Sequence, residues 1–280
     1  MESKLVSILL PVYGDSPFLL DCLKSIELQN GIQKLELIVL LDRVLSRSLK
    51  IIEEFKPEFK KEIIVNNIGG LVNSLNLGIQ YARGDLIARI DHDDLMSASR
   101  LKIQHDFLLQ KPEYVLLGSN LNIIDVRGNF VRKTSYPLEH ESITIELKKR
   151  NVFAHSSVMY RREAVIAAGM YRPFYEGVED FDLWQRLARV GKMANLSLCL
   201  TTYRQHENQM SIKHAKKIWI GTEAINFNSR SGNVRKLVHT EWDSCDAWFK
   251  NQILLQAKYL IFRLRRFLTQ TYLLWVRNVK

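Results

Sequence analysis

An apolar segment leads directly into three carboxylates at residues 86–94, where the sequence is Leu-Ile-Ala-Arg-Ile-Asp-His-Asp-Asp. Its mostly apolar residues and its length predict a short buried strand over 86–90. The negative charge of Asp91, Asp93 and Asp94 at the end of that strand costs free energy unless a cation or a hydrogen-bond donor offsets it. Oxygen ligands of this kind suit Mg²⁺ or Mn²⁺. The segment therefore predicts a metal site at the end of a strand.

Two other interpretations apply to the same acidic turn. In the first, Asp94 or Ser97 caps the helix that follows. In the second, the turn is a calcium loop of the EF-hand type, which needs Gly at its sixth position and Glu at its twelfth. Met96 and Lys102 stand at those positions, so the calcium loop is excluded. The residues alone leave a helix cap and a metal that bridges a nucleotide diphosphate as equal alternatives.

Short apolar strands alternate with helical patterns on both sides of this segment. Strands are predicted at residues 6–10, where Pro11 ends the first, and at 37–41, 63–65, 86–90 and 115–117. Such alternation indicates an α/β fold with a mostly parallel sheet covered by helices on both faces. Because ligands bind beyond the carboxyl ends of such strands, a site is expected among the loops 11–16, 42–47, 66–70 and 91–97.

Residues 119–212 have a less regular pattern. An edge strand is expected at 120–126, turning at Gly128 and Asn129, with further strands at 157–160 and 196–203. A helix is expected at 181–190, ended by Gly191. The chain of 280 residues thus has enough length for a large core.

The net charge of +10 by itself suggests nucleic acid or an anionic membrane as partner. The charge is unevenly distributed, however. Residues 1–212 hold 27 basic and 26 acidic residues, whereas residues 213–280 hold 13 and 4. No nucleic-acid-binding motif is present, and the basic tail also carries an apolar stripe. We therefore expect no nucleic-acid partner.

Several other classes are disfavoured by missing motifs. The sequence contains no GxGxxG, no GxxxxGK[ST], no HExxH and no cluster with zinc spacing. Three cysteines without a CxxC pattern favour a reduced, cytoplasmic protein. Charges interrupt the apolar runs near the C-terminus, so a membrane-spanning helix is not expected.

Three further positions carry polar groups with two interpretations each. Asp42 ends an apolar strand, where it could accept a hydrogen bond from a nucleotide base or cap the next helix. The cluster Glu179-Asp180-Phe181-Asp182 could supply a general base or only complement a helix dipole. His206 could bind a metal or be an ordinary surface histidine.

In their order along the chain, these features resemble those of the family 2 glycosyltransferases, which have the GT-A fold and use nucleotide-sugar donors. The resemblance covers about residues 3–212 and is greatest to members that build bacterial surface polysaccharides such as lipopolysaccharide, capsule and exopolysaccharide. The matching segments are 7–13, 36–42, 70–71 with 75–79, 88–94, 155–161, 179–184 and 203–208.

The resemblance implies a donor site. Pro11, Tyr13 and Asp42 would hold the base and ribose, and Asn76 would lie near the donor. Many members have Asp-Asp-Gly-Ser after the second strand, whereas Arg43 stands here where a Gly would follow the Asp. A uridine nucleotide remains the expected donor.

The resemblance also implies a metal site and a catalytic base. Asp93 would bind Mn²⁺ or Mg²⁺ directly, Asp91 would lie nearer the ribose, and His206 would join the metal from the far side. Asp180 would be the catalytic base. The acceptor side would include His155, Glu179 and Trp184.

The expected function is therefore metal-dependent, inverting transfer of a sugar from a UDP-sugar to a hydroxyl of a glycan or lipid-linked oligosaccharide. The expected domain spans residues 1–212, with a nucleotide-sugar half over about 1–118 and an acceptor half over 119–212. The alternatives are a nucleotidyltransferase with a similar sheet and a non-catalytic, membrane-associated assembly subunit. Sugar, acceptor, linkage and oligomeric state stay open.

Residues 213–280 predict a basic amphipathic helical tail. One face would carry Phe249, Ile253, Ala257, Leu260, Leu264, Phe267, Leu268 and Trp275, and the other mostly Lys258, Arg263, Arg265, Arg266 and Arg277. Such a helix can lie on an anionic membrane or pack on the catalytic domain. The first interpretation predicts a peripheral protein at the inner face of the cytoplasmic membrane.

Overall fold

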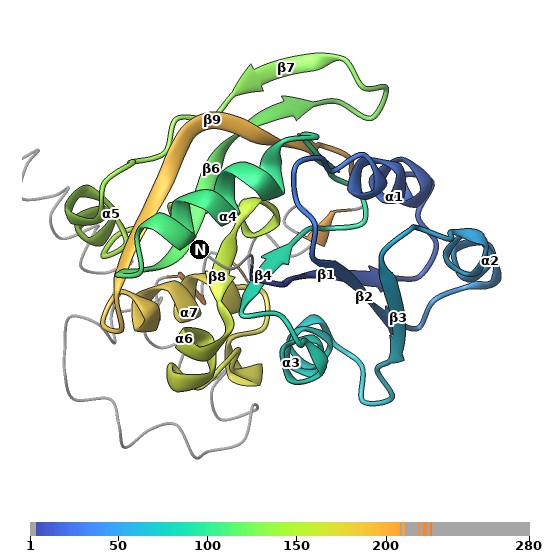
Figure 1. Ribbon diagram of the computed structural model, residues 1–280, viewed down its shortest axis with the longest axis horizontal. Helices are drawn as coiled ribbons and strands as arrows, with labels where there is room; N and C mark the ends of the chain where they lie inside the picture. The colour runs from blue at the N-terminus through green and yellow to red at the C-terminus, as the bar shows by residue number, and fades with distance from the viewer. Residues whose placement is uncertain (1–3, 208, 211–217, 219–220, 223–224, 226–280) are drawn as a thin grey trace, which may run out of the picture. The chain divides into compact units, whose positions relative to one another are not determined.

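The first four long strands are parallel and lie side by side in the order β3-β2-β1-β4 (Figure 1). They are β1 (Val6–Tyr13), β2 (Leu35–Asp42), β3 (Lys60–Val65) and β4 (Leu86–Arg89). The helices between them are α1 (Leu19–Glu27), α2 (Ser46–Glu54) and α3 (Leu71–Tyr81). The computed structural model describes residues 4–207, 209–210, 218, 221–222 and 225.

Alternate residues of the central strands enter two separate cores, one on each face of the sheet. Leu9 and Leu40 pack with α3 and with the later helices α6 (Arg162–Ala167) and α7 (Glu179–Leu187). Ile8 and Val39 pack on the opposite face with α1, α2 and α4 (Arg100–Gln110). The near-continuous apolar sequence of β1 and β2 thus reflects burial on both faces.

Pro11 lies inside β1 and does not end it, contrary to the sequence prediction. The pairing of β1 with β4 stops at Leu9 and Arg89, whereas its pairing with β2 continues to Tyr13. Leu9 accepts a hydrogen bond from the backbone of Ile90, and Pro11, two residues on, faces the same edge. The missing N–H of Pro11 therefore lies where β4 has already ended and costs no ladder hydrogen bond.

The second half of the sheet is mixed, whereas the sequence predicted a mostly parallel one. The strands are β5 (Leu95–Met96), β6 (Tyr114–Ile124), β7 (Phe130–Lys133), β8 (Met159–Arg161) and β9 (Lys192–Arg204). The order continues β4-β8-β6-β9-β5, with β7 on β6. Only β6 and β9 are parallel there. The remaining elements are α5 (His140–Glu146), η1 (His155–Ser157) and η2 (Pro173–Tyr175).

The single strand β6 includes the predicted strand 115–117 and most of the predicted strand 120–126, and it ends at Ile124. The polar residues Ser119 and Asn120 interrupt the apolar pattern but are hydrogen-bonded. Asn120 donates to the carbonyl oxygen of Ser197 and accepts from the backbone of Tyr136. Gly118 lies where an added Cβ would be 2.7 Å from the ring of Phe153. The predicted turn at Gly128 and Asn129 does connect β6 to β7.

The short strand β5 holds the acidic turn next to the end of β9. Leu95 and Met96 pair with Thr202 and Thr201 of β9. This pairing brings the segment after β9 next to residues 91–94. The predicted tail, residues 213–280, lies outside the described residues except at positions 218, 221, 222 and 225. Within the described part of the chain, every helix is too short or too polar to cross a membrane.

Candidate active site

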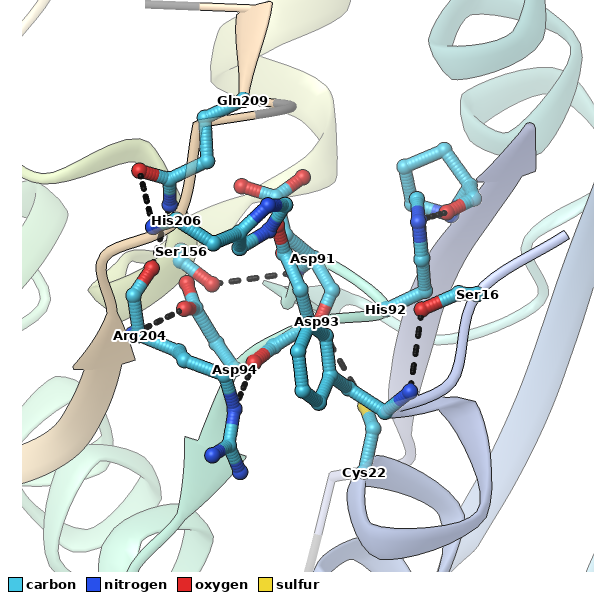
Figure 2. Close-up of polar contacts among 12 residues, drawn as sticks. Ser16, Cys22, Asp91, His92, Asp93, Asp94, Ser156, Arg204, His206 and Gln209 are labelled. Atoms are coloured by element: carbon cyan, nitrogen blue, oxygen red, sulfur yellow. Dashed lines mark hydrogen bonds and ion pairs between the residues drawn. The ribbon is translucent and has the colours of Figure 1, made fainter. Parts of the chain in front are cut away.

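The three carboxylates of the acidic turn converge beyond the end of β4 (Figure 2). Asp91, Asp93 and Asp94 each place a carboxylate oxygen within 4.8 Å of the other two. No other group of three or more possible metal ligands occurs among the described residues. The arrangement is therefore able to hold a hard divalent cation through oxygen ligands.

Arg89 neutralises one of these carboxylates. Its side chain is 3% exposed, and both of its terminal nitrogens donate to Asp91, one of them at 2.6 Å. The backbone N–H of Asp91 donates to the hydroxyl of Ser156 at 2.9 Å. Burial raises the pKa of Asp91, and Arg89 opposes that rise. Because Arg89 donates to both oxygens of Asp91, Asp93 is freer than Asp91 to bind a cation.

His206 approaches Asp93 from the segment that follows β9. Its Nε2 lies 2.9 Å from Oδ2 of Asp93, and the two side chains are 15% exposed. The ring of Phe18 packs against His206 with centroids 5.2 Å apart and stacks on the guanidinium of Arg204 at 4.5 Å. His206 is thus held among site residues and is not a free surface histidine.

Asp94 lies at the base of the cluster and is completely buried. Its Oδ1 accepts from the backbone N–H of Arg204 at 3.0 Å. Burial, with Asp93 and Asp91 nearby, raises its pKa well above the usual range. A bound cation would offset this concentration of charge. The helix-cap interpretation is wrong, because α4 begins after Ser99 and has no side-chain cap.

The predicted base-binding residues end adjacent strands. The register of β1 and β2 pairs Tyr13, which is 59% exposed, with Asp42, which is buried. Oδ2 of Asp42 accepts from the backbone of Gly70 at 2.7 Å. Its buried Oδ1 accepts no hydrogen bond from the described residues and lies 4.0 Å from Nε of Arg43. That oxygen therefore has an unused acceptor position, although it has almost no accessible surface in this structure.

Asp42 does not cap the following helix. The residue before α2 is Leu45, which has no side-chain cap, and Asp15 accepts from the backbone of Ser48 inside that helix. Pro11 is buried, and its carbonyl oxygen lies 3.2 Å from Nδ1 of His92. The contact of Pro11 joins β1 to the acidic turn, and that of Asp15 joins the first loop to α2.

Asn76 has a different environment from the one expected beside a donor. Its Nδ2 donates to the carbonyl oxygen of Tyr171 at 2.8 Å, and its Oδ1 accepts from the N–H of Tyr171 at 3.0 Å. Both polar atoms of this amide are therefore used to hold the backbone of Tyr171 against α3.

The second acidic cluster forms the first turn of α7. Asp180 accepts from Asn151 and from the backbone of Phe181, each at 2.7 Å. Burial raises the pKa of Asp180. Burial and the neighbouring Asp180 raise the pKa of Glu179 to about 7. The helix-dipole interpretation and a general-base role are compatible at this position.

His155 connects this cluster to the rest of the site. Its Nε2 lies 2.8 Å from the hydroxyl of Tyr171, and its Nδ1 lies 3.8 Å from Oε1 of Glu179. Burial lowers the pKa of His155 well below the usual range, and the charge of Arg89 adds to this. His155 is therefore neutral near pH 7. Because Ser156, its neighbour on η1, binds Asp91, this short helix contacts both acidic clusters.

Trp184 does not line an open cleft, and the prediction that placed it on the acceptor side is wrong in that respect. It has no exposed surface and belongs to the core. Its ring meets His155 edge-on at 5.7 Å and Phe153 at 6.0 Å. The apolar residues of α7 at helical spacing explain this burial. Trp184 therefore packs against His155 from within the core.

Three residues that the structure brings to the site were not predicted from the sequence: Arg89, Asn151 and Tyr171. A signal existed for Arg89, since a charged residue inside an apolar strand needs a buried partner. Asn151 and Tyr171 lie in irregular segments, and their contacts depend on the packing of α3 and α7.

The sequence is similar to those of known proteins. A sequence model described as Glycosyl transferase family 2 matches residues 7–168, more than half of the chain. The O-antigen biosynthesis glycosyltransferase WbnJ of Escherichia coli is 31% identical over 148 residues, which cover 52% of this chain and 57% of WbnJ. The amylovoran biosynthesis glycosyltransferase AmsE of Erwinia amylovora is 31% identical over 196 residues, which cover 68% and 72%. The match thus spans little more than half of WbnJ.

Solved structures share the fold at low sequence identity. TarS of S. aureus in complex with UDP-GlcNAc has a TM-score of 0.64 and 16% identity, covering 79% of this chain and 65% of TarS. The mannosyltransferase PcManGT from Pyrobaculum calidifontis in complex with GDP-Man and Mn²⁺ has a TM-score of 0.60 and 15% identity, covering 81% and 64%. This chain spans slightly less than two thirds of each.

Proposed function

The chain belongs to glycosyl transferase family 2 and has the GT-A fold, and on that premise we propose that it transfers a sugar from a nucleotide-sugar donor to an acceptor hydroxyl. The observation that carries the proposal is the position of η1 between the two acidic clusters. Ser156 binds the backbone of Asp91, and His155 lies beside Glu179. The residues that would bind the diphosphate and the general base that would deprotonate the hydroxyl thus lie at the same edge of the sheet.

A divalent cation, Mn²⁺ or Mg²⁺, fits the donor side of this site. Asp93 and His206 would hold it, with the buried Asp94 adding negative charge behind them. When bound, the cation would stabilise the charge that develops on the leaving diphosphate. The convergence of three carboxylates supports this assignment.

The remaining chemistry belongs to the protein's own side chains. Asp180 takes the proton from the acceptor hydroxyl as its oxygen bonds to the anomeric carbon. The bond from that carbon to the diphosphate oxygen breaks, and its electron pair leaves with the diphosphate. A single displacement of this kind inverts the anomeric centre. Buried Arg89 holds Asp91 in place, and the exposed ring of Tyr13, beside Asp42 at the ends of β1 and β2, receives the nucleoside.

The donor is proposed to be a UDP-sugar and the acceptor a glycan or lipid-linked oligosaccharide of bacterial surface polysaccharide synthesis. The names of WbnJ and AmsE support the pathway class, and the TarS complex supports the nucleotide. A thermal-shift panel of UDP- and GDP-sugars with Mn²⁺ tests the donor, because a bound donor stabilises the folded state. A larger shift with GDP-sugars would contradict the uridine assignment.

Two substitutions test the mechanism. We expect Asp180→Asn and Asp93→Ala to abolish sugar transfer, measured by nucleoside diphosphate release and product mass, while circular dichroism shows an intact fold. Asp106→Asn, on the surface of α4, serves as the control and keeps full activity. Full activity in either site variant would refute its assignment, and release of pyrophosphate would indicate a nucleotidyltransferase instead.

We also propose that residues 213–280 hold the enzyme on the inner face of the cytoplasmic membrane. The support is the sequence of that region, with 13 basic and 4 acidic residues and an apolar stripe. A lipid-linked acceptor would then meet the site at the membrane surface.

A further inference from the structure

Asn151 contacts the carboxylate of Asp180 from outside α7. It lies in the segment between α5 and η1, and its Nδ2 donates to Oδ2 of Asp180 at 2.7 Å. Its Oδ1 accepts from the backbone N–H of Phe153 at 3.1 Å. Since only the amide oxygen can accept that bond, the N–H side of the Asn151 amide must face Asp180.

The other oxygen of Asp180 is held by its own helix. Oδ1 accepts from the N–H of Phe181 at 2.7 Å. The carboxylate therefore has one donor on each oxygen, and Asn151 is the side-chain donor. The segment that carries Asn151 is itself anchored, because the ring of Phe153 packs edge-on against Trp184 of α7.

We propose that Asn151 is a positioning residue for proton transfer, which orients the Asp180 carboxylate toward the acceptor hydroxyl and keeps it ionised. This inference rests on the proposed function, in which Asp180 is the general base. A hydrogen bond donated to a carboxylate favours its charged form. Removal of that bond changes both the orientation of the base and the pH at which it becomes active.

The other charged and titratable groups near Asp180 come from several elements. Glu179 is its neighbour on α7, and Arg89 reaches it from β4 and favours its ionised form. Burial raises the pKa of Tyr171 well above the usual range and also raises that of Tyr136, so both remain neutral in the working range. The substitution of Asn151 leaves all of these groups in place.

The test is the pH dependence of kcat between pH 5 and pH 9 for the full chain with Mn²⁺. We expect Asn151→Ala to lower kcat at least about tenfold. The acidic limb of the profile should move up by about one pH unit, because a hydrogen bond to a charged group contributes about that much. The KM for the donor should change less than about twofold, since Asn151 contacts the base and not the donor side.

Asn129→Ala is the matched control. Asn129 also donates to an aspartate, Oδ2 of Asp125 at 2.9 Å, but it does so in the turn between β6 and β7. It should keep the wild-type profile. Asn151→Ser is measured beside Asn151→Ala, and thermal unfolding with donor titration identifies which of the two is folded and binds donor.

The outcomes separate this inference from the proposed function. Full activity in Asp180→Asn would overturn the proposed base. An inactive Asp180→Asn together with a wild-type profile in a folded Asn151 variant would overturn only the positioning role. A lowered kcat with an unmoved acidic limb would show that Asn151 has no influence on ionisation and would also overturn the inference as stated.

Discussion

Arg43 adopts a left-handed backbone conformation, with φ of +50°, directly after Asp42. A residue with a side chain loses about 1 kcal/mol in that conformation, whereas glycine does not. The side chain of Arg43 is 75% exposed, and its Nε lies 4.0 Å from Oδ1 of Asp42. We therefore expect Arg43→Gly to raise the free energy of unfolding by up to about 1 kcal/mol and Tm by about 2–4 °C.

Thermal unfolding of Arg43→Gly and Arg43→Ala measures this effect. Alanine keeps the strained conformation and loses the same side chain, so it should give no gain. Equal Tm values for the two variants would show that the left-handed conformation is not the source of the effect.

Glu179 makes stability depend on pH. Its pKa is raised to about 7 from the ordinary 4.5 by burial and by Asp180. The folded state thus holds this proton more tightly than the unfolded state. The resulting stabilisation is fully present below pH 4.5 and is lost as the pH rises through 7. The loss corresponds to about 3 kcal/mol, from roughly 1.4 kcal/mol per pKa unit.

Glu179→Gln removes this titration. The free energy of unfolding of the variant minus that of wild type should increase by up to about 3 kcal/mol from pH 5 to pH 8. Urea unfolding at each pH measures this difference. Glu53→Gln, on the exposed side of α2, should show a constant difference from wild type. The same constancy for Glu179→Gln would contradict the raised pKa.

At single positions, the sequence indicated which residues lie together better than it indicated their contacts. The proximity of the strand-end carboxylates to one another and to His206 could be predicted, because their residue types and order are informative. The pairing of Arg89 with Asp91 and of Asn151 with Asp180 depends on how η1 and α7 pack, which no local pattern contains. Trp184 was misplaced because the family likeness was given more weight than the apolar spacing of α7.

Among the elements, α4 is tied to the site through its first residue. Arg100 is completely buried. Its guanidinium donates to the carbonyl oxygens of Ser156, Arg89 and Val158 at 2.7, 2.9 and 3.1 Å. These carbonyls lie at the end of β4 and around η1, so Arg100 holds together the two elements that carry Asp91 and His155.

Arg100→Met should destabilise the fold by at least about 3 kcal/mol, because it leaves three buried carbonyl groups without this donor. Urea unfolding at pH 7.5 measures the change. Lys102→Met on the same helix loses only an exposed ion pair with Asp106, and we expect a cost below about 1 kcal/mol. Similar losses in the free energy of unfolding for both variants would contradict the role of Arg100 in holding β4 and η1 together.

In the first half, β1, β2 and α3 were predicted well, because the two strands are mostly apolar and the helix has an apolar face. The second half was predicted less well for a physical reason. In β6, Ser119 and Asn120 are buried polar residues that interrupt the apolar pattern although the strand continues, and the partners of Asn120 lie in other segments. Antiparallel pairing of β8 could not be inferred from an alternating pattern.

At the scale of the whole molecule, one continuous sheet carries both the predicted nucleotide half and the predicted acceptor half. The donor-side residues end β1, β2 and β4, while Asp180 lies on α7, which packs against the face of the same sheet that α3 covers. This arrangement explains why ordered motifs spread over about 200 residues can form one site. The charge is also divided at this scale, because residues 1–212 are nearly neutral and residues 213–280 are strongly basic.

The tail prediction is tested by charge reversal in the full chain. If residues 213–280 bind anionic lipid, each basic residue near the surface contributes about 1 kcal/mol, so replacing Lys258, Arg263, Arg265 and Arg266 by Glu should weaken vesicle binding about a hundredfold or more. Cosedimentation with vesicles that contain phosphatidylserine measures it, and wild-type binding should weaken at high salt. Glutamate at Lys24, Lys50, Lys56 and Lys148 makes the same charge change on the catalytic domain and should reduce binding far less. Equal sedimentation of the tail variant and this control would place the membrane contact elsewhere or exclude it.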